Sequence, residues 1–105
     1  MNEDTATSIV ALTFHRHVRE FALRRDGMIY AMDGGLWLHR HVWRGTPMAH
    51  LVSADHGRLL AYGVQVGLPS HRLQFKPLKD PRTSLRRDAW HWDLVGRFLP
   101  PCSPG

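Results

Sequence analysis

Residues 55–67 read Asp55-His56-Gly57-Arg58-Leu59-Leu60-Ala61-Tyr62-Gly63-Val64-Gln65-Val66-Gly67. The apolar positions of this stretch recur at helical spacing. Asp55, or Ser53 just before it, suits the N-terminal cap of a helix, and Gly67 suits the C-terminal stop. The sequence therefore predicts a helix over 55–67, around which the rest of the fold is arranged.

Short strands are predicted on both sides of this helix. The first covers 28–33: its apolar run 28–32 lies between Gly27 and the turn residues that begin at Asp33, as in a buried strand. The second covers 72–76, where apolar and polar residues alternate. Strand, helix and strand together make a βαβ unit. We therefore predict an α/β fold: a small single domain with a short βαβ unit and an added N-terminal helix.

The remaining segments complete this prediction. Apolar residues at helical spacing indicate an N-terminal helix from Ile9 to Arg25, although 8–14 could instead open as a strand. The other assignments are a loop over 36–49 with room for one short strand, a short strand or the approach to a helix over 50–53, a loop over 77–89 and a third strand over 89–95. The chain then divides into an N-terminal extension (1–27), an α/β domain (28–95) and a Pro-rich tail (96–105).

Length and composition fit one small globular domain. The chain has 105 residues, of which 43% are apolar and 22% are charged. Its single cysteine, Cys102, cannot form a disulfide within the chain, which favours a reducing compartment. The sequence shows no signal peptide and no apolar run of membrane length. We expect a cytoplasmic protein with no membrane partner.

The positive charge is unevenly distributed. The net charge is +5, and residues 1–27 carry equal numbers of basic and acidic side chains, so the whole excess lies in 28–105. Six basic side chains lie within the run 72–87 against a single acidic one, Asp80. A basic run of this kind attracts phosphate backbones, and aromatic rings beside cations can stack on bases. The nucleic-acid-binding candidates are Arg72, Lys76, Lys79, Arg82, Arg86, Arg87 and Trp90. The alternative is a solvated, solubilising loop.

Candidate metal ligands occur at the ends of the predicted elements. Phosphate-loop, dinucleotide-binding, serine-hydrolase and zinc-protease motifs are absent from the sequence. Carboxylate and imidazole side chains together suit a divalent metal such as Mn²⁺, Zn²⁺ or Fe²⁺. The candidates are Asp33, His50, Asp55, His91 and Asp93. The alternative is that the aspartates cap turns and helices while the histidines are ordinary polar groups.

Two His-x-His pairs could also chelate a metal if they lay in strands. His15 and His17 fall in a predicted helix, where residues two apart do not face each other. His39 and His41 fall in a predicted loop, and a ligand role for them stays open.

Several short motifs occur together between about residues 28 and 95: Met28–Asp33, Trp37, Trp43-Arg44-Gly45, Ala49–Asp55, Ala61-Tyr62, Val66-Gly67-Leu68-Pro69, Phe75-Lys76-Pro77 and His91-Trp92-Asp93-Leu94. This combination carries a resemblance to a small bacterial and phage family known as domain of unknown function 4031. The resemblance implies the α/β fold and a bacterial or phage origin, and it supplies no reaction. Members usually begin at the position of Met28, which makes 1–27 an extension. Leu60 stands where members often carry a histidine, which weakens a shared metal site on that helix.

Three functions remain in view, with binding favoured over catalysis. The first is a nucleic-acid-associated binding module, based on the basic run. The second is a phage-type accessory or inhibitor protein that docks to a larger protein. The third is a metal-dependent phosphoester hydrolase that uses the Asp and His cluster, with a divalent metal as cofactor.

Overall fold

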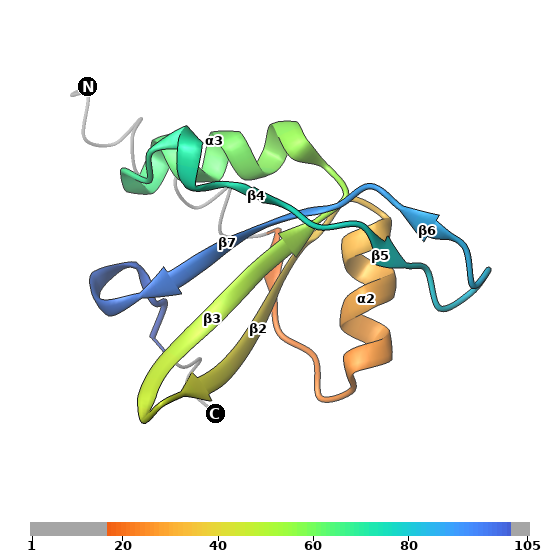
Figure 1. Ribbon diagram of the computed structural model, residues 1–105, viewed down its shortest axis with the longest axis horizontal. Helices are drawn as coiled ribbons and strands as arrows, with labels where there is room; N and C mark the ends of the chain where they lie inside the picture. Colours follow the sequence, from red (N-terminus) through yellow and green to blue (C-terminus); the bar gives the residue numbers. More distant parts are fainter. Residues whose placement is uncertain (1–16, 102–105) are drawn as a thin grey trace, which may run out of the picture.

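The computed structural model describes residues 17–101, in which a mixed sheet is flanked by two helices (Figure 1). The helices are α2 (Arg24–Met32) and α3 (His56–Val66), with short 3₁₀ turns η1 (Ser70–Arg72) and η2 (Gly96–Phe98). The strands are β1 (Val18–Arg19), β2 (Leu36–Trp43), β3 (Thr46–Ser53), β4 (Gln74–Phe75), β5 (Leu78–Lys79), β6 (Arg86–Arg87) and β7 (Trp90–Val95). The predicted α/β class is confirmed.

The central sheet has five strands in the order β1-β2-β3-β7-β4. β1 is parallel to β2, whereas every later neighbour in the sheet is antiparallel. Because β3 and β4 are both antiparallel to β7, they are parallel to each other, and α3 joins them. The sheet therefore contains a βαβ crossover with β7 inserted between its two strands. β5 and β6 form a separate hairpin beyond α2 (Figure 1).

The helix predicted over 55–67 is confirmed as α3. Asp55 caps it by accepting a 3.0 Å hydrogen bond from the backbone N–H of Arg58, and Gly67 ends it in the left-handed conformation, with φ of 89°. One face of α3 packs on the sheet, where the core residues are Leu36, Leu38, Ala49, Leu51, Leu59, Tyr62, Leu68, Trp92 and Leu94. The indole N–H of Trp92 donates a 2.8 Å hydrogen bond to the carbonyl of Leu59. We call this side of the sheet the α3 face.

The strand predicted over 28–33 is wrong, because residues 28–32 form the second half of α2. The buried residues of α2 are Gly27, Ala31 and Met32, whose spacing suits one helical face. They pack against Trp37 and Val52 on the other side of the sheet. Gly27 lies inside the helix, where a Cβ would overlap the Trp37 ring. An apolar run this short suits a strand or a buried helix equally, so tertiary packing decides between them. The first strand of the βαβ unit is β3.

The loop predicted over 36–49 is also wrong, because this segment forms most of a long hairpin. β2 and β3 are joined at Arg44 and Gly45, which have φ of 49° and 79°. Two successive residues at positive φ give a tight turn whose twist matches that of the flanking strands. The strand predicted over 50–53 is the end of β3. The strands predicted over 72–76 and 89–95 correspond to β4 and β7, while the loop predicted over 77–89 holds β5 and β6.

The N-terminal helix predicted over 9–25 falls partly on residues 1–16, outside the described residues. Within the described part it is wrong up to Leu23: Val18 and Arg19 form β1, which pairs with β2, and α2 begins at Arg24. The division between 27 and 28 thus cuts through α2.

Arg40 holds the two ends of the described chain against the sheet. Its guanidinium donates hydrogen bonds to the Glu20 carboxylate at 2.8 Å and to the carbonyls of Pro100 and Pro101 at 2.7 and 2.8 Å.

Among residues 17–101, no helix has the length and apolar character needed to cross a membrane.

Candidate metal centre

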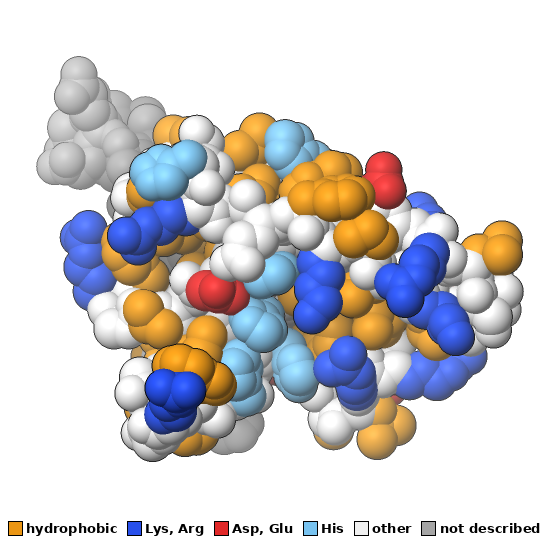
Figure 2. Space-filling view, in the orientation of Figure 1, with side chains coloured by type: hydrophobic (Ala, Val, Ile, Leu, Met, Phe, Trp, Pro, Cys, Tyr) orange, Lys and Arg blue, Asp and Glu red, His pale blue; other side chains and the backbone are white. Residues whose placement is uncertain are grey.

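A row of histidines lies on the side of the sheet opposite α3. Side chains alternate between the two faces of a strand. The strand register places His50 opposite both His39 of β2 and Asp93 of β7. We call the uncovered part of this side the open face; its residues are His39, His41, Trp43, Met48, His50, His91 and Asp93. Figure 2 shows histidine side chains gathered along the middle of the molecule, with an acidic side chain on one flank and basic side chains on the other.

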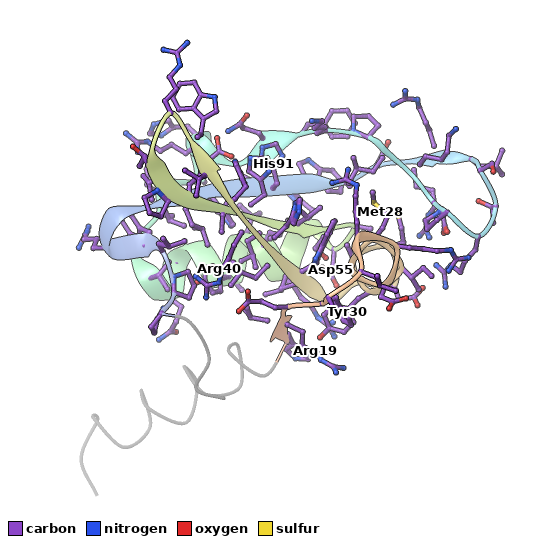
Figure 3. The ribbon with its side chains drawn as sticks, turned by 90° about the horizontal axis from the view of Figure 1, so that it is seen from below. Arg19, Met28, Tyr30, Arg40, Asp55 and His91 are labelled. Carbon is purple, nitrogen blue, oxygen red and sulfur yellow. The ribbon has the colours of Figure 1, made fainter. Side chains whose placement is uncertain are left out.

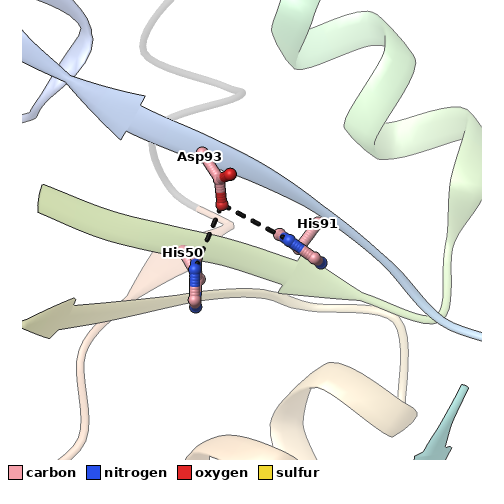
Figure 4. A group of neighbouring side chains, drawn as sticks. All are labelled: His50, His91 and Asp93. Atoms are coloured by element: carbon pink, nitrogen blue, oxygen red, sulfur yellow. Dashed lines mark ion pairs between the residues drawn. The ribbon is translucent and has the colours of Figure 1, made fainter. Parts of the chain in front are cut away.

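His50, His91 and Asp93 form the centre of the open face (Figure 4). Oδ1 of Asp93 lies 3.1 Å from Nε2 of His50 and 3.3 Å from Nε2 of His91. One ligand atom from each side chain lies within 4.8 Å of the other two. The structure thus brings together three of the five candidate ligands named from the sequence.

Gln74 holds the remaining oxygen of Asp93. Its side-chain amide donates a 2.8 Å hydrogen bond from Nε2 to Oδ2 of Asp93. Gln74 reaches this position because β4 pairs with β7, which puts Gln74 opposite His91. A hydrogen bond of this kind orients a metal-ligating carboxylate, and it leaves Oδ1 directed at the histidines.

Ring contacts extend the row along the sheet. The imidazole of His50 lies 4.6 Å from that of His41 and 4.8 Å from that of His91, measured between ring centroids. His39 stacks on Trp37 at 4.9 Å. The strands thus bring together imidazoles that are up to 52 residues apart in the sequence, from His39 to His91.

The surroundings favour neutral imidazoles. Burial is the largest influence on the pKa of His50 and lowers it, with His91 acting in the same direction and Asp93 opposing. Burial likewise lowers the pKa of His91, which Asp93 raises and Lys76 lowers further. The pKa of His39 is lowered by burial and then by Arg24. A neutral imidazole has the free nitrogen lone pair that a metal requires.

Two cations lie beside the histidines. Arg24, Lys76, His39, His50 and His91 border a pocket of about 60 Å³. This volume is small beside the roughly 300–1,000 Å³ of ligand pockets, so the pocket suits a compact group such as an oxyanion. The guanidinium of Arg24 also lies 5.8 Å from the centroid of the Trp37 ring, at the same end of the sheet. The pocket combines positive charge with direct access to the metal-binding side chains.

Asp33 and Asp55 do not join the cluster, so the prediction is wrong for them. Asp33 follows α2 and pairs with the guanidinium of Arg82 at 2.9 Å. Asp55 caps α3 and faces Arg58, with 3.6 Å between their charged atoms. Figure 3 shows His91 and Asp55 well apart, on different elements. Asp55 has the capping role that was the alternative in the sequence, whereas Asp33 ends α2 with its carboxylate in an ion pair.

Four of the six basic residues named from the sequence, Lys79, Arg82, Arg86 and Arg87, lie on the β5-β6 hairpin or in its turn. Asp80 is 2% exposed and binds Arg82 at 3.0 Å and Arg87 at 3.3 Å. Hydrogen bonds, those of Arg82 first, hold the pKa of Asp80 far below its ordinary value. Arg82 and Arg87 are therefore engaged in organising the turn after β5. Trp90 lies on the α3 side, where it contacts His56.

Of the remaining basic candidates, Lys76 borders the cationic pocket. Arg72, Lys79 and Arg86 are exposed on η1, β5 and β6.

The roles of Arg24 and Gln74 were missed at the sequence level, and those of His39 and His41 were left open. The signal for the histidines was present, because Leu36-Trp37-Leu38-His39-Arg40-His41-Val42-Trp43 places both of them on one side of an extended strand. Gly45 and Pro47 follow this stretch, and these two residues favour a loop in the sequence. Arg24 and Gln74 carry no local signal, because the sheet order and the position of α2 bring them to the site.

No family model, curated protein or solved structure matches this chain. The resemblance to domain of unknown function 4031 therefore stays a prediction, and the functional argument rests on the geometry of the open face.

Proposed function

We propose that this protein is a divalent-metal-dependent phosphoester hydrolase whose metal ligands are His50, His91 and Asp93. The observation that carries the proposal is the meeting of these side chains, with imidazole nitrogens 3.1 and 3.3 Å from one carboxylate oxygen. Metal bonds of about 2.0–2.1 Å to each ligand separate neighbouring ligand atoms by roughly 3.0–3.4 Å. The two imidazole–carboxylate distances fall in this range, and the three ligand atoms lie within 4.8 Å of one another.

The ligand set favours a catalytic site over a purely structural one. Two imidazoles and a carboxylate are the protein ligands of some catalytic zinc sites and of mononuclear iron sites with open positions. All three side chains approach from the sheet, and the Asp93 side chain is 42% exposed, so the outward coordination positions face solvent. A metal bound here would lower the pKa of a coordinated water and polarise a phosphoryl oxygen.

Charge on one side of the cluster supports a phosphoester as substrate. Arg24 and Lys76 border the 60 Å³ pocket together with His50 and His91. Fixed cations beside a reacting phosphoryl group stabilise the negative charge on its oxygens. The same cations would repel a positively charged substrate, so the pocket favours anionic esters.

The reaction needs only water as a second reactant. The oxygen of water bonds to phosphorus, the ester P–O bond breaks, and the proton lost by the water ends on the leaving oxygen. His41 contacts His50 and lies outside the proposed ligand set. We assign His41 as the carrier of this proton, since histidine is the side chain that most often transfers protons in catalysis.

Metal titration tests the proposal directly. Protein freed of metal with EDTA is titrated with Zn²⁺ or Mn²⁺ and assayed with bis(p-nitrophenyl) phosphate. The wild type is expected to bind one equivalent and to hydrolyse the ester. His91→Ala and Asp93→Asn remove a ligand atom and should weaken metal binding by more than about 100-fold, since even indirect partners of ligands contribute 10- to 100-fold.

His71→Ala is the matched control, because His71 is exposed on η1, outside the open face. It should keep both metal affinity and activity. Wild-type protein that binds neither metal, or ligand variants with unchanged affinity, would overturn the proposal.

The second candidate is a nucleic-acid-associated binding module. It is supported by the net charge of +5 and by the exposed Lys79 and Arg86 on the β5-β6 hairpin. It predicts affinity for single-stranded DNA that falls steeply with salt and falls further in Arg86→Glu. Binding without metal-dependent hydrolysis would favour this candidate. Docking to a larger protein stays a prediction from the sequence.

A further inference from the structure

The open face continues past the metal cluster into a second hollow. This hollow has a volume of about 390 Å³ and is bordered by His41, Trp43, Met48, His50 and Asp93. Its size falls within the range of about 300–1,000 Å³ that is usual for small-molecule sites. Because His50 and Asp93 border it, a molecule bound there would touch the proposed metal ligands.

Trp43 gives this hollow an aromatic wall. The chain has four tryptophans, and Trp43 is 56% exposed, whereas Trp37 and Trp92 are at most 2% exposed. The fourth, Trp90, is half-buried against Phe75 and His56. The large indole of Trp43 is thus left free of the core at the edge of the proposed reaction site.

A cation accompanies the exposed indole. The guanidinium of Arg44 lies 4.5 Å from the centroid of the Trp43 ring. The pair is held at the tight turn between β2 and β3, where Arg44 and Gly45 have positive φ. An aromatic ring with a cation beside it is the combination that binds the bases of single-stranded nucleic acids. Met48 adds a polarizable apolar surface to the same hollow.

The features of the open face follow a definite order. The cationic pocket with Arg24 and Lys76 lies on one side of His50, and the hollow with Trp43 lies on the other. A nucleotide has the same order of chemistry, with a phosphoester that can reach the metal cluster and a flat base beyond it. Simple phosphate esters would leave the hollow unused.

We propose that the hollow beside Trp43 binds the base of a nucleotide, so that nucleotide phosphoesters are the substrate class of this site. This inference rests on the proposed function for the reaction, whereas binding of the base needs only the residues of the hollow. Stacking on Trp43 contributes to binding of the substrate and leaves the bond-breaking step unchanged.

The test compares two esters with the same leaving group: thymidine 5′-(p-nitrophenyl phosphate) and methyl p-nitrophenyl phosphate. With the metal-loaded wild type, we expect the thymidine ester to have the lower KM. Trp43→Ala should raise that KM by about tenfold, the effect of losing one stacked base, with little change in kcat. KM for the methyl ester should not move, and Trp43→Phe should largely restore the thymidine value. Equal KM values for both esters, unaffected by Trp43→Ala, would overturn the inference and leave the hydrolase intact.

A binding experiment separates this inference from the proposed function. Metal-free protein is titrated with adenosine and followed by NMR at the indole N–H of Trp43 and the methyl group of Met48. Saturable shifts at both groups in the wild type, with the Met48 shift lost in Trp43→Ala, support the base site even if neither ester is hydrolysed. The absence of shifts at both groups at millimolar adenosine would overturn it.

Discussion

The two sides of the central sheet are formed by the same strands, yet they differ in burial and in side-chain chemistry. Leu51 and His50 are neighbours in β3, yet Leu51 is fully buried on the α3 face while the His50 side chain is 34% exposed on the open face. Leu94 and Asp93 show the same contrast in β7, with Leu94 fully buried and the Asp93 side chain 42% exposed. The α3 face provides the larger of the two core clusters, and α2 covers Trp37 and Val52 on the opposite side. The open face, which α2 leaves uncovered, carries imidazole and carboxylate groups that add little to packing, so their positions are open to a chemical role.

The largest expected difference between the two sides is in stability. Leu51→Ala should lower the free energy of unfolding by about 3 kcal/mol, because it leaves a cavity among fully buried neighbours. His50→Ala, one residue away, should change it by less than about 1 kcal/mol, as for most substitutions away from the core. Urea denaturation of the metal-free variants measures both values. Similar losses for the two variants would contradict the division between a folding side and a chemical side.

A smaller effect is expected at Gly63, where α3 meets the sheet. A Cβ at this position would overlap the Trp92 ring, whereas one at Gly57 in the same helix meets only the Asp55 carboxylate, at 3.5 Å. Gly63→Ala should therefore cost about 1–3 kcal/mol through overpacking. Gly57→Ala should be neutral or stabilising by up to about 1 kcal/mol, the gain in helix propensity.

Thermal or urea unfolding of this glycine pair tests the packing of α3 on the sheet. If Gly63→Ala were as stable as Gly57→Ala, the close approach of Trp92 to α3 would be wrong.

Local sequence signals predicted the helices and strands whose structure is set by residues within the same segment. α3 has a cap at Asp55, helical spacing and a glycine stop, all within one segment. β7 alternates apolar and polar residues, which puts His91 and Asp93 on one side of a strand. The pairing of β7 with β3 then brings in His50. These three side chains are part of the group of five candidate ligands named from the sequence.

The parts that failed depend on partners distant in the sequence. Residues 28–32 are helical because Ala31 and Met32 pack against Trp37 and Val52, and no short-range pattern reveals those contacts. Asp33 and Asp55 resembled ligands by position, but Arg82 and the start of α3 engage them instead. Arg24 reaches the site only because α2 packs on the same side of the sheet, at one end of the open face.

The smallest expected effect is a pH dependence confined to the open face. Burial lowers the pKa of His50 and of His91 below the ordinary histidine value of 6.5, so the folded protein resists their protonation. The unfolded chain takes up these protons near pH 6.5, before the folded protein does. Stability of the metal-free protein is therefore intact above pH 6.5. It should decline as the pH falls from there through the lowered pKa values of the folded state.

The urea midpoint of metal-free protein between pH 7.5 and 5 measures this decline, and His91→Gln should reduce it, because glutamine offers no proton site. Leu51→Ala serves as a contrast: it lowers the midpoint at every pH and leaves the slope with pH unchanged, since Leu51 lies on the α3 face and does not titrate. A flat wild-type midpoint over this range would mean that the histidines are as well solvated as in the unfolded chain. The open face would then lack the partial burial that keeps its imidazoles neutral and ready to bind a metal.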